Sequence, residues 1–286
     1  HTRYWRDWSS DVCSSDLPPP HRGLDARVHG WAGRWRRRGA TVVRLREQAE
    51  RAEEQAHAMG DLSDHDLRAR LLEHRNHFRR GGRFRTEAMV PALAALREAA
   101  HRILGLRAFP EQLMGAMAMD EGNLAEMATG EGKTLAAGLA AILRAWMGRP
   151  CHVITVNDYL VERDERWLGP LFGFCHLTHG HVVATMPPDA RREAYDRDIT
   201  YGTSKEVTAD FLRDRIRPAM VGSADGRLAR SLLEGVRRDP ALVQRGLHSA
   251  IIDEADSILI DEAVTPLILS APRPNAALRE VVELAH

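Results

Sequence analysis

Two glycines, a lysine and a threonine stand close together in segment 127–134, which reads Met-Ala-Thr-Gly-Glu-Gly-Lys-Thr. Glycine at Gly130 and Gly132 lets successive backbone N–H groups turn toward an anion, and the apolar run that follows predicts a helix whose amino-terminal end adds positive potential. In such a loop Lys133 would reach the β- and γ-phosphates of a nucleoside triphosphate, and the Thr134 hydroxyl would bind Mg²⁺. The spacing favours a phosphate-binding loop over an ordinary glycine turn at the start of a helix.

This loop departs from the strict pattern Gly-x-x-x-x-Gly-Lys-Ser/Thr, because Met127 stands where that pattern has its first glycine. It is the variant Thr-Gly-x-Gly-Lys-Thr. The predicted ligands of the ATP phosphates are Thr129, Gly130, Glu131, Gly132, Lys133 and Thr134.

A second motif is the apolar run 250–252 followed by the acids Asp253 and Glu254. In a nucleotide-hydrolysing site, Asp253 would complete the Mg²⁺ shell, and Glu254 would orient and deprotonate the attacking water. Apolar strands that end in acids are also common at surface turns. The motif therefore gains its weight from the phosphate-binding loop that precedes it by several strand-helix units.

A third group, Leu106, Phe109 and Gln112, precedes the loop. A glutamine side chain donates and accepts at once, which matches the N6/N7 edge of adenine, and apolar or aromatic neighbours pack on the ring. Without the loop, an exposed glutamine at a helix start would be the simpler interpretation. With it, we predict that these three residues bind the base.

The elements that position these residues divide the chain into a helical part and an α/β part. Helical spacing predicts three helices in the first part. The first covers 41–59, the second begins at a capping box formed by Ser63 and Asp66 and ends at Gly81, and the third covers about 86–104. After Phe109, short apolar runs alternate with helical patterns, which indicates a parallel sheet. The predicted strands are 124–127, 152–156, 199–201 and 250–252, and 217–246 is predicted to be an insertion with one short helix near 228–236.

Composition limits the class of protein. The chain has 286 residues, 44% of them hydrophobic and 28% charged, which suits one or two soluble domains. Lys plus Arg and Asp plus Glu both number 40, so net charge indicates no partner. Arginines crowd the stretch 27–46, where either an anionic surface could bind or a basic helix face is simply solvated.

Metal, disulfide and membrane signals are weak. The three cysteines have no Cys-x-x-Cys spacing, so neither a disulfide framework nor a cysteine zinc site is expected. His176, His179 and His181 are predicted to lie in a loop without carboxylate partners. The longest apolar helical run, 135–143, is well below the ~18 residues of a membrane span, so we expect a cytosolic protein.

Both ends of the sequence suggest a fragment. Residues 1–17 show no amphipathic period and are interpreted as a non-native or artefactual segment. Residues 278–286 begin a helical pattern that stops abruptly.

The order of the motifs resembles the SecA family of protein-export ATPases. Thr-Val-Asn-Asp-Tyr-Leu at 155–160 and Asp-Ser-Ile-Leu-Ile-Asp-Glu-Ala at 256–263 are far more specific than a generic phosphate loop. The likeness runs from about residue 40 to residue 286. Its segments are 62–64, 102–107, 109–112, 125–134, 154–164, 198–203 and 253–263.

The resemblance implies a fold and a division of the chain. The fold is α/β, a RecA-like P-loop NTPase domain with a parallel sheet, preceded by a mainly helical amino-terminal arm. The arm would cover 18–105, and the first part of nucleotide-binding domain 1 would cover 106–270, with the insertion at 217–246. Residues 271–286 would begin a truncated preprotein cross-linking domain.

The resemblance also implies a motor that uses ATP and Mg²⁺ to push unfolded preproteins through the SecYEG channel. Such a protein is cytoplasmic and associates peripherally with the inner membrane. Contacts with anionic lipids and a homodimer are left open, and no nucleic acid is expected. Arg163 is predicted to be a structural link near the nucleotide cleft.

Four departures from the family pattern affect no phosphate or metal ligand. They bear instead on how nucleotide binding is coupled to movement of the preprotein. Ala128 stands where the family usually has Lys or Arg, Val264 where it has Arg, segment 205–215 differs, and 217–246 is longer than the usual link. A housekeeping motor and an accessory SecA therefore both remain open.

Two other classes compete with this interpretation. Asp-Glu-Ala-Asp at 253–256 is also the signature of DEAD-box RNA helicases or related nucleic-acid translocases, although those proteins carry Pro-Thr-Arg-Glu-Leu-Ala where this chain has Val-Asn-Asp-Tyr-Leu. The other alternative is a nucleotide-binding module without turnover. Hydrolysis in the family needs a second RecA-like domain, so the isolated 286 residues are expected to be nearly inactive.

Overall fold

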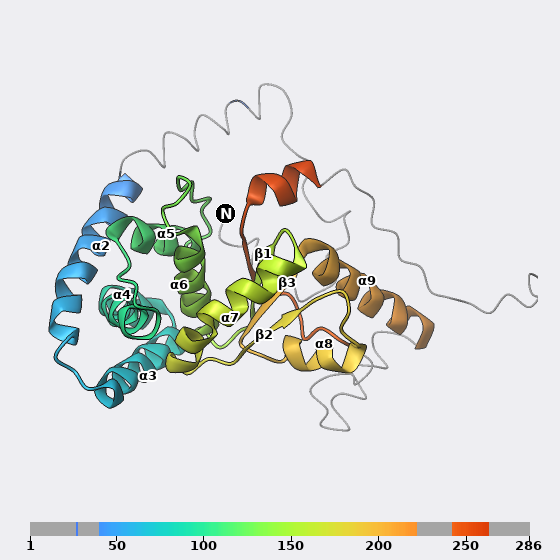
Figure 1. Cartoon of the computed structure of the whole chain (residues 1–286), viewed down its shortest axis with the longest axis horizontal. Helices are drawn as coiled ribbons and strands as arrows, with labels where there is room; N and C mark the ends of the chain where they lie inside the picture. The colour runs from blue at the N-terminus through green and yellow to red at the C-terminus, as the bar shows by residue number, and fades with distance from the viewer. Residues whose placement is uncertain (1–26, 28–39, 222–241, 263–286) are drawn as a thin grey trace, which may run out of the picture.

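A four-stranded parallel sheet organises the α/β part of the chain (Figure 1). The computed structural model describes residue 27, residues 40–221 and residues 242–262. The strand order is β2-β3-β1-β4. Because the paired strands are parallel, their carboxyl ends meet at one edge of the sheet, where ligands bind in folds of this type. The strands are β1 (Cys151–Thr155), β2 (His179–Val182), β3 (Ile199–Thr203) and β4 (Ser249–Ile252).

Helices cover both faces of the sheet, which explains why β1 and β3 are buried along their whole length. On one face, Val153 belongs to the main core with residues of α6 (Lys133–Ala145) and α7 (Asp158–Phe174). On the other face, Ile154 packs with Val207 of α9 (Ser204–Val221) and Ile258 of the π-helix η2 (Ser257–Asp261). The helix α8 (Pro188–Tyr195) packs against Val182 of β2.

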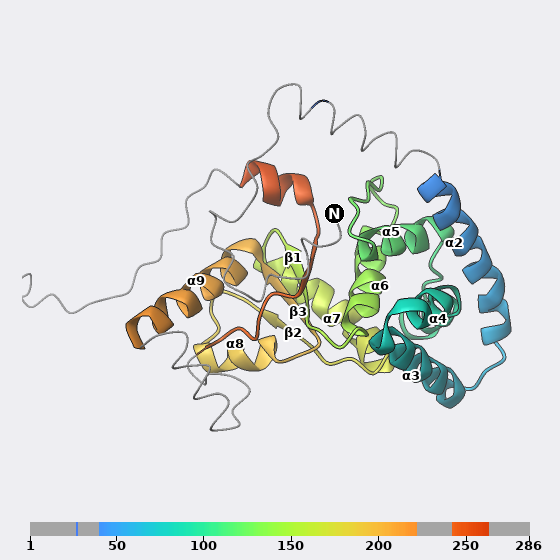
Figure 2. The same ribbon diagram turned by 180° about the vertical axis from the view of Figure 1, so that it is seen from behind.

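The helical part precedes the sheet and packs on α6 and α7 (Figures 1 and 2). The predicted helix start at Ser63 is confirmed, since the Ser63 hydroxyl accepts the Asp66 N–H at 3.1 Å and so caps α3. The third predicted helix begins at Gly82 rather than near residue 86. The helices are α2 (Ala40–Met59), α3 (Asp64–Arg80), α4 (Gly82–Leu104) and α5 (Pro110–Asp120).

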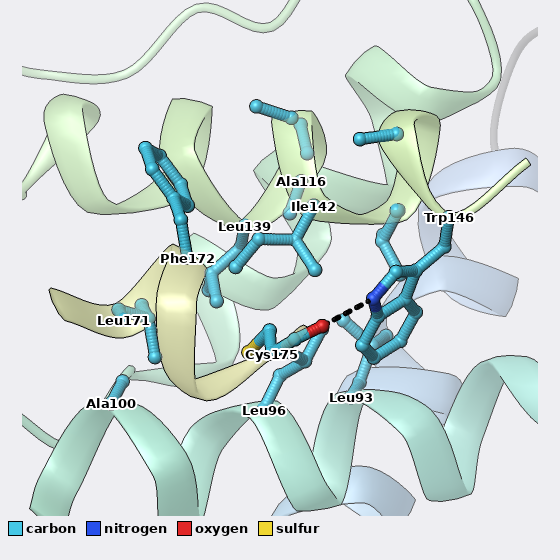
Figure 3. Close-up of a cluster of buried hydrophobic side chains, with 14 of the residues drawn as sticks. Leu93, Leu96, Ala100, Ala116, Leu139, Ile142, Trp146, Leu171, Phe172 and Cys175 are labelled. Atoms are coloured by element: carbon cyan, nitrogen blue, oxygen red, sulfur yellow. Dashed lines mark hydrogen bonds between the residues drawn. The ribbon is translucent and has the colours of Figure 1, made fainter. Parts of the chain in front are cut away.

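One hydrophobic core joins the helical part to the sheet. Figure 3 shows Leu96 of α4 beside Leu139 of α6 and Phe172 of α7, all fully buried. The Trp146 indole N–H donates to the Cys175 carbonyl at 3.1 Å, so the one polar atom of this large buried ring is satisfied. The boundary predicted near residue 105 is therefore crossed by continuous packing.

One predicted strand was wrong, and one strand of the sheet was not predicted. The predicted strand 124–127 is irregular, and no strand of the described ranges pairs with it. Leu124 is 84% exposed, so its apolar side chain buries little surface that could hold a strand in place. Conversely, β2 was predicted as a loop, because histidines and a glycine interrupt its apolar pattern.

Several predictions lie outside the described residues. They concern segment 1–17, the helix near 228–236, Val264 and segment 271–286. The insertion predicted from residue 217 starts inside α9, which continues to Val221. Every helix in the described ranges is too short or too polar to cross a lipid bilayer.

Candidate nucleotide-binding site

The phosphate-binding loop has the backbone that its glycines predict. Gly130 has φ +88° and Gly132 has φ +78°, a left-handed conformation that strains any residue with a side chain. The Ala128 N–H donates to the Glu131 carboxylate at 2.9 Å, which closes the loop on itself. Gly132 is the residue before α6, so Lys133 is the first residue of that helix. The first N–H groups of a helix have no intrahelical acceptor, and here they lie directly behind the glycine loop.

The acids that follow β4 lie at the carboxyl edge of the sheet. The Asp253 N–H donates to the Ile154 carbonyl of β1 at 2.9 Å, which extends the sheet pairing by one residue. Burial raises the pKa of the Asp253 carboxyl, the carboxylates of Glu254 and Asp164 raise it further, and the Lys133 ammonium lowers it. The Lys133 ammonium thus acts electrostatically on Asp253, although the two residues are 120 positions apart in the sequence. In Figures 1 and 2, the loop before α6 and the segment after β4 rise at the same end of the molecule.

Glu254 is exposed and has φ +58°. A residue other than glycine rarely adopts this conformation, and such local strain is concentrated at functional sites. Its carbonyl accepts the Ile258 N–H at 3.1 Å, which begins the turn into η2. The turn thereby leaves the carboxylate in solvent next to Asp253.

A cavity of about 430 Å³ lies beside the loop. It brings together five of the predicted site residues, three expected at the base and two in the loop. The five are Leu106, Phe109, Gln112, Gly132 and Thr134. Its lining is mainly apolar, which suits a nucleobase better than a phosphate chain. The other predicted residues, Thr129, Gly130, Glu131, Lys133, Asp253 and Glu254, do not line it.

Gln112 is held by the protein at both ends of its amide. Its Oε1 accepts the Phe109 N–H at 3.1 Å, and its Nε2 donates to the Glu131 carbonyl at 2.7 Å. A Cβ on Gly132 would lie 2.3 Å from that Nε2, so the glutamine packs directly on the loop. One N–H and one lone pair of the amide are left for a base. Its predicted role at adenine stays a prediction, and the structure adds a role in shaping the loop.

Helix α7 contributes cavity residues that the sequence did not identify as such. Arg163 was predicted as a structural link near the cleft, and it pairs with the buried carboxylate of Asp164, with Nε and Nη2 both 2.7 Å from Oδ1. Asp164 and Trp167 also line the cavity, and neither was predicted. Arg163, Asp164 and Trp167 lie on one face of α7, because they are one and three positions apart in sequence. Helical periodicity counted from Arg163 could have found them.

The Asn157 side chain explains part of the Thr-Val-Asn-Asp-Tyr-Leu motif. It accepts the Leu160 N–H at 2.9 Å and so caps the start of α7, while Asp158 accepts the Ala184 N–H at 3.1 Å. These two bonds fix the start of the helix that carries Asp164 and Trp167.

The donor set fits Mg²⁺ held jointly with a nucleotide. Among the described residues, no three His, Cys, Asp or Glu side chains converge as a metal cage. Mg²⁺ is commonly held by one or two protein ligands together with waters and phosphate oxygens. Thr134, which is half-buried at the start of α6, and Asp253 could supply those ligands.

His179 and His181 correct a further prediction. The two rings were expected to lack carboxylate partners, but each places its Nδ1 against the Glu165 carboxylate, at 3.2 Å for His181. The three side chains lie between α7 and β2, away from the cavity lining. This contact was not expected, because β2 was not predicted.

A family model described as SecA DEAD-like domain matches residues 32–286. The chain is 46% identical over 270 residues to protein translocase subunit SecA 2 of Chlorobium chlorochromatii, covering 92% of this chain and 40% of that protein. It is 44% identical over 267 residues to SecA 2 of Magnetococcus marinus, covering 92% and 41%.

A third relative is protein translocase subunit SecA of Methylococcus capsulatus, 44% identical over 211 residues, which cover 74% of this chain and 21% of the relative. The chain therefore spans about two fifths of the SecA 2 relatives and about one fifth of this one.

Proposed function

The chain belongs to the SecA DEAD-like domain family, and from that membership we propose that it binds MgATP as the nucleotide-binding part of a preprotein motor. The single observation that carries the proposal is geometric: Lys133 begins α6 directly after the glycine loop, and Asp253 follows β4 at the carboxyl edge of the sheet. This geometry supports a site that combines a lysine at a helix start with an acid at the end of a strand. That pairing is what binding of a metal-nucleotide complex requires.

The proposed roles follow from the positions of the residues. The backbone N–H groups of Gly130, Gly132 and Lys133 bind phosphate oxygens, and the Lys133 ammonium reaches the β- and γ-phosphates. Thr134 and Asp253 hold Mg²⁺, which when bound neutralises negative charge on the phosphates.

Glu254 is proposed to orient the attacking water and take its proton. Its exposure leaves the carboxylate accessible to water at the open side of the site. Leu106, Phe109 and Gln112 are proposed to bind the base in the cavity.

At the level of the whole protein, we propose that ATP hydrolysis drives unfolded preproteins through the SecYEG channel. The protein would act from the cytoplasm at the inner membrane. The 286 residues alone are expected to turn ATP over very slowly, because a second RecA-like domain is needed to place arginines against the γ-phosphate.

Replacing Lys133 tests the binding proposal, and the chain offers a matched control. The sequence has only two lysines, Lys133 and Lys205. In calorimetric titrations, Lys133→Ala should weaken MgATP binding by roughly 10- to 100-fold, the usual range for loss of a charged hydrogen-bond donor. Lys205 is exposed and pairs with Glu262 at 3.1 Å, so Lys205→Ala should bind MgATP like the parent. Equal affinity of all three proteins would refute the proposal.

The helicase alternative is tested by stimulation of hydrolysis. In the full-length protein, preproteins together with SecYEG should raise the ATPase rate, and single-stranded RNA should not. Stimulation by RNA alone would favour the nucleic-acid translocase.

A further inference from the structure

Trp167 is a cavity residue with no assigned role. It lies on α7, whereas Leu106 and Phe109 lie just before and at the start of α5. Helix α6 packs against both α5 and α7. The cavity at the amino-terminal end of α6 therefore receives side chains from two flanks, and Trp167 supplies the large aromatic group on the α7 flank.

Close helix packing fixes where Trp167 sits. At Gly138 of α6, a Cβ would lie 2.8 Å from the Leu168 Cδ1, so the two helices approach as closely as glycine allows. Leu168 is fully buried there, and Trp167 is the adjacent residue. One turn earlier, Asp164 is also buried at the cavity. The backbone beneath Trp167 is thus anchored on both sides, while its side chain stays outside the core.

Trp167 keeps an accessible aromatic surface at this anchored position. It is 38% exposed, whereas Trp146, which directly follows the neighbouring helix α6, is fully buried and bonded to the Cys175 carbonyl. Within the described ranges, the Trp167 indole N–H makes no hydrogen bond. A large ring that stands on an anchored backbone, lines an apolar cavity and makes no hydrogen bond with the described residues is suited to pack against a flat ligand.

Resting on the proposed function, we infer that Trp167 is the aromatic wall against which the base of the nucleotide packs. The glycine loop and Lys133 account for the phosphates but leave the apolar cavity unfilled. A purine matches that cavity in chemistry, because its faces are apolar and its edge can reach the remaining hydrogen-bonding capacity of Gln112. Trp167 thereby adds affinity for the base that is separate from the affinity for the phosphates.

The experiment compares ATP with inorganic tripolyphosphate, which carries the phosphates without a base. Binding of each Mg²⁺ complex is measured for the parent chain and for Trp167→Ala, Trp167→Phe and Tyr159→Ala. Tyr159 is the matched control, because it is an exposed aromatic residue on the same helix and does not line the cavity. Lys133→Ala is measured in parallel.

We expect Trp167→Ala to weaken ATP binding about tenfold, the size of one base–aromatic stack, and to change tripolyphosphate binding by less than about twofold. Trp167→Phe should retain most of the affinity, and Tyr159→Ala should match the parent. Addition of ATP should change the tryptophan emission of the parent, and this change should be absent in Trp167→Phe.

Two results would overturn the inference. Trp167→Ala could bind ATP like the parent, or it could lose ATP and tripolyphosphate to the same extent, which would indicate a general disturbance of the site. Either result leaves the proposed function standing if Lys133→Ala still weakens both ligands. If Lys133→Ala weakens neither, the proposed function itself fails.

Discussion

Lys133 stands out because the chain otherwise uses arginine almost throughout: Lys and Arg together number 40, and only two of them are lysines. A lysine ammonium is a compact point charge that fits between phosphate oxygens, whereas the larger guanidinium prefers planar, bidentate partners. Retention of lysine at this position is consistent with a phosphate ligand.

A chemical test follows from the scarcity of lysine. MgATP at ten times its Kd should slow acetylation of Lys133 by an N-hydroxysuccinimide ester about tenfold, because only the unoccupied tenth of the protein reacts. Lys205, exposed on α9, should react at an unchanged rate. Peptide mass spectrometry measures both sites in one sample. Equal protection of the two lysines, or of neither, would contradict the assignment.

The contact between Gly132 and Gln112 can be measured with a double-mutant cycle. Gly132→Ala should lower the free energy of unfolding by about 2 kcal/mol or more, because it adds a side chain at positive φ and a Cβ that overlaps the Gln112 amide. In a Gln112→Ala background the overlap disappears, and only the backbone cost of about 1–2 kcal/mol should remain. Chemical denaturation of the four proteins gives the coupling. Strict additivity would show that the two residues do not touch.

At the residue scale, the sequence predicts the parts of the site that are local in the chain. The loop and the group Leu106, Phe109 and Gln112 follow from spacing and side-chain chemistry, and the structure brings members of both into one cavity. Asp164 and Trp167 were not predicted, although helical spacing from Arg163 puts them on the same face of α7. Their position depends on how α7 packs against α6 at Gly138, a contact between segments about 30 residues apart.

At the scale of elements, α8 and α9 are joined by a buried charge cluster. The Asp210 carboxylate accepts from Arg191 Nη1 at 2.9 Å, from the Tyr195 hydroxyl at 3.0 Å and from Arg213 Nη1 at 2.8 Å. Asp214, one turn on, accepts the Gln244 N–H at 2.7 Å. Segment 205–215, which departs from the family pattern, therefore supplies the acids that hold this layer together.

Removal of the central acid should be costly. Asp210→Ala leaves Arg191 buried beside Glu206 alone, and it should lower the free energy of unfolding by roughly 3–5 kcal/mol. The matched control is Glu193→Ala, which breaks an exposed i,i+4 pair with Arg197 and should cost less than about 1 kcal/mol. Urea denaturation measures both variants. Similar losses in the two would mean that the cluster is not a buried ion pair.

The elements also show where sequence patterns fail. The helices of the arm were predicted because each carries its own periodicity and end signals, such as Ser63 and Gly81. The strand at 124–127 was wrong because an apolar pattern does not provide a pairing partner. Strand β2 was missed because its pairing with β3 outweighs the low strand propensity of histidine and glycine.

At the scale of the whole molecule, one buried histidine in the helical arm and one in the sheet are expected to make the free energy of unfolding depend on pH in the same direction. Burial lowers the pKa of His74 in α3 and of His152 in β1 from 6.5 to about 4 in each case. Their ring nitrogens have no hydrogen-bond partner among the described residues. Both rings are therefore neutral in the folded protein at pH values where they would be charged in the unfolded chain.

The direction of the pH effect follows from this difference. Between about pH 6.5 and pH 4, the unfolded chain binds protons that the folded protein does not, so stability falls as the pH is lowered. At pH 5, each histidine should reduce the free energy of unfolding by about 2 kcal/mol relative to pH 8. Carboxyls with a raised pKa, such as that of Asp120, act in the opposite direction, so variants must be compared with the parent.

Urea denaturation at pH 8 and pH 5 separates these contributions. His74→Leu and His152→Leu should each remove about 2 kcal/mol of the loss seen in the parent between the two pH values, since leucine takes up no proton. His65→Leu is the control, because the side chain of His65 is 92% exposed. This variant removes a histidine that is not buried. If the two buried-site variants lose as much stability as the parent on acidification, the histidines are not the acid-sensitive groups. Loss of the effect in only one of them would instead locate the acid sensitivity in the arm or in the sheet.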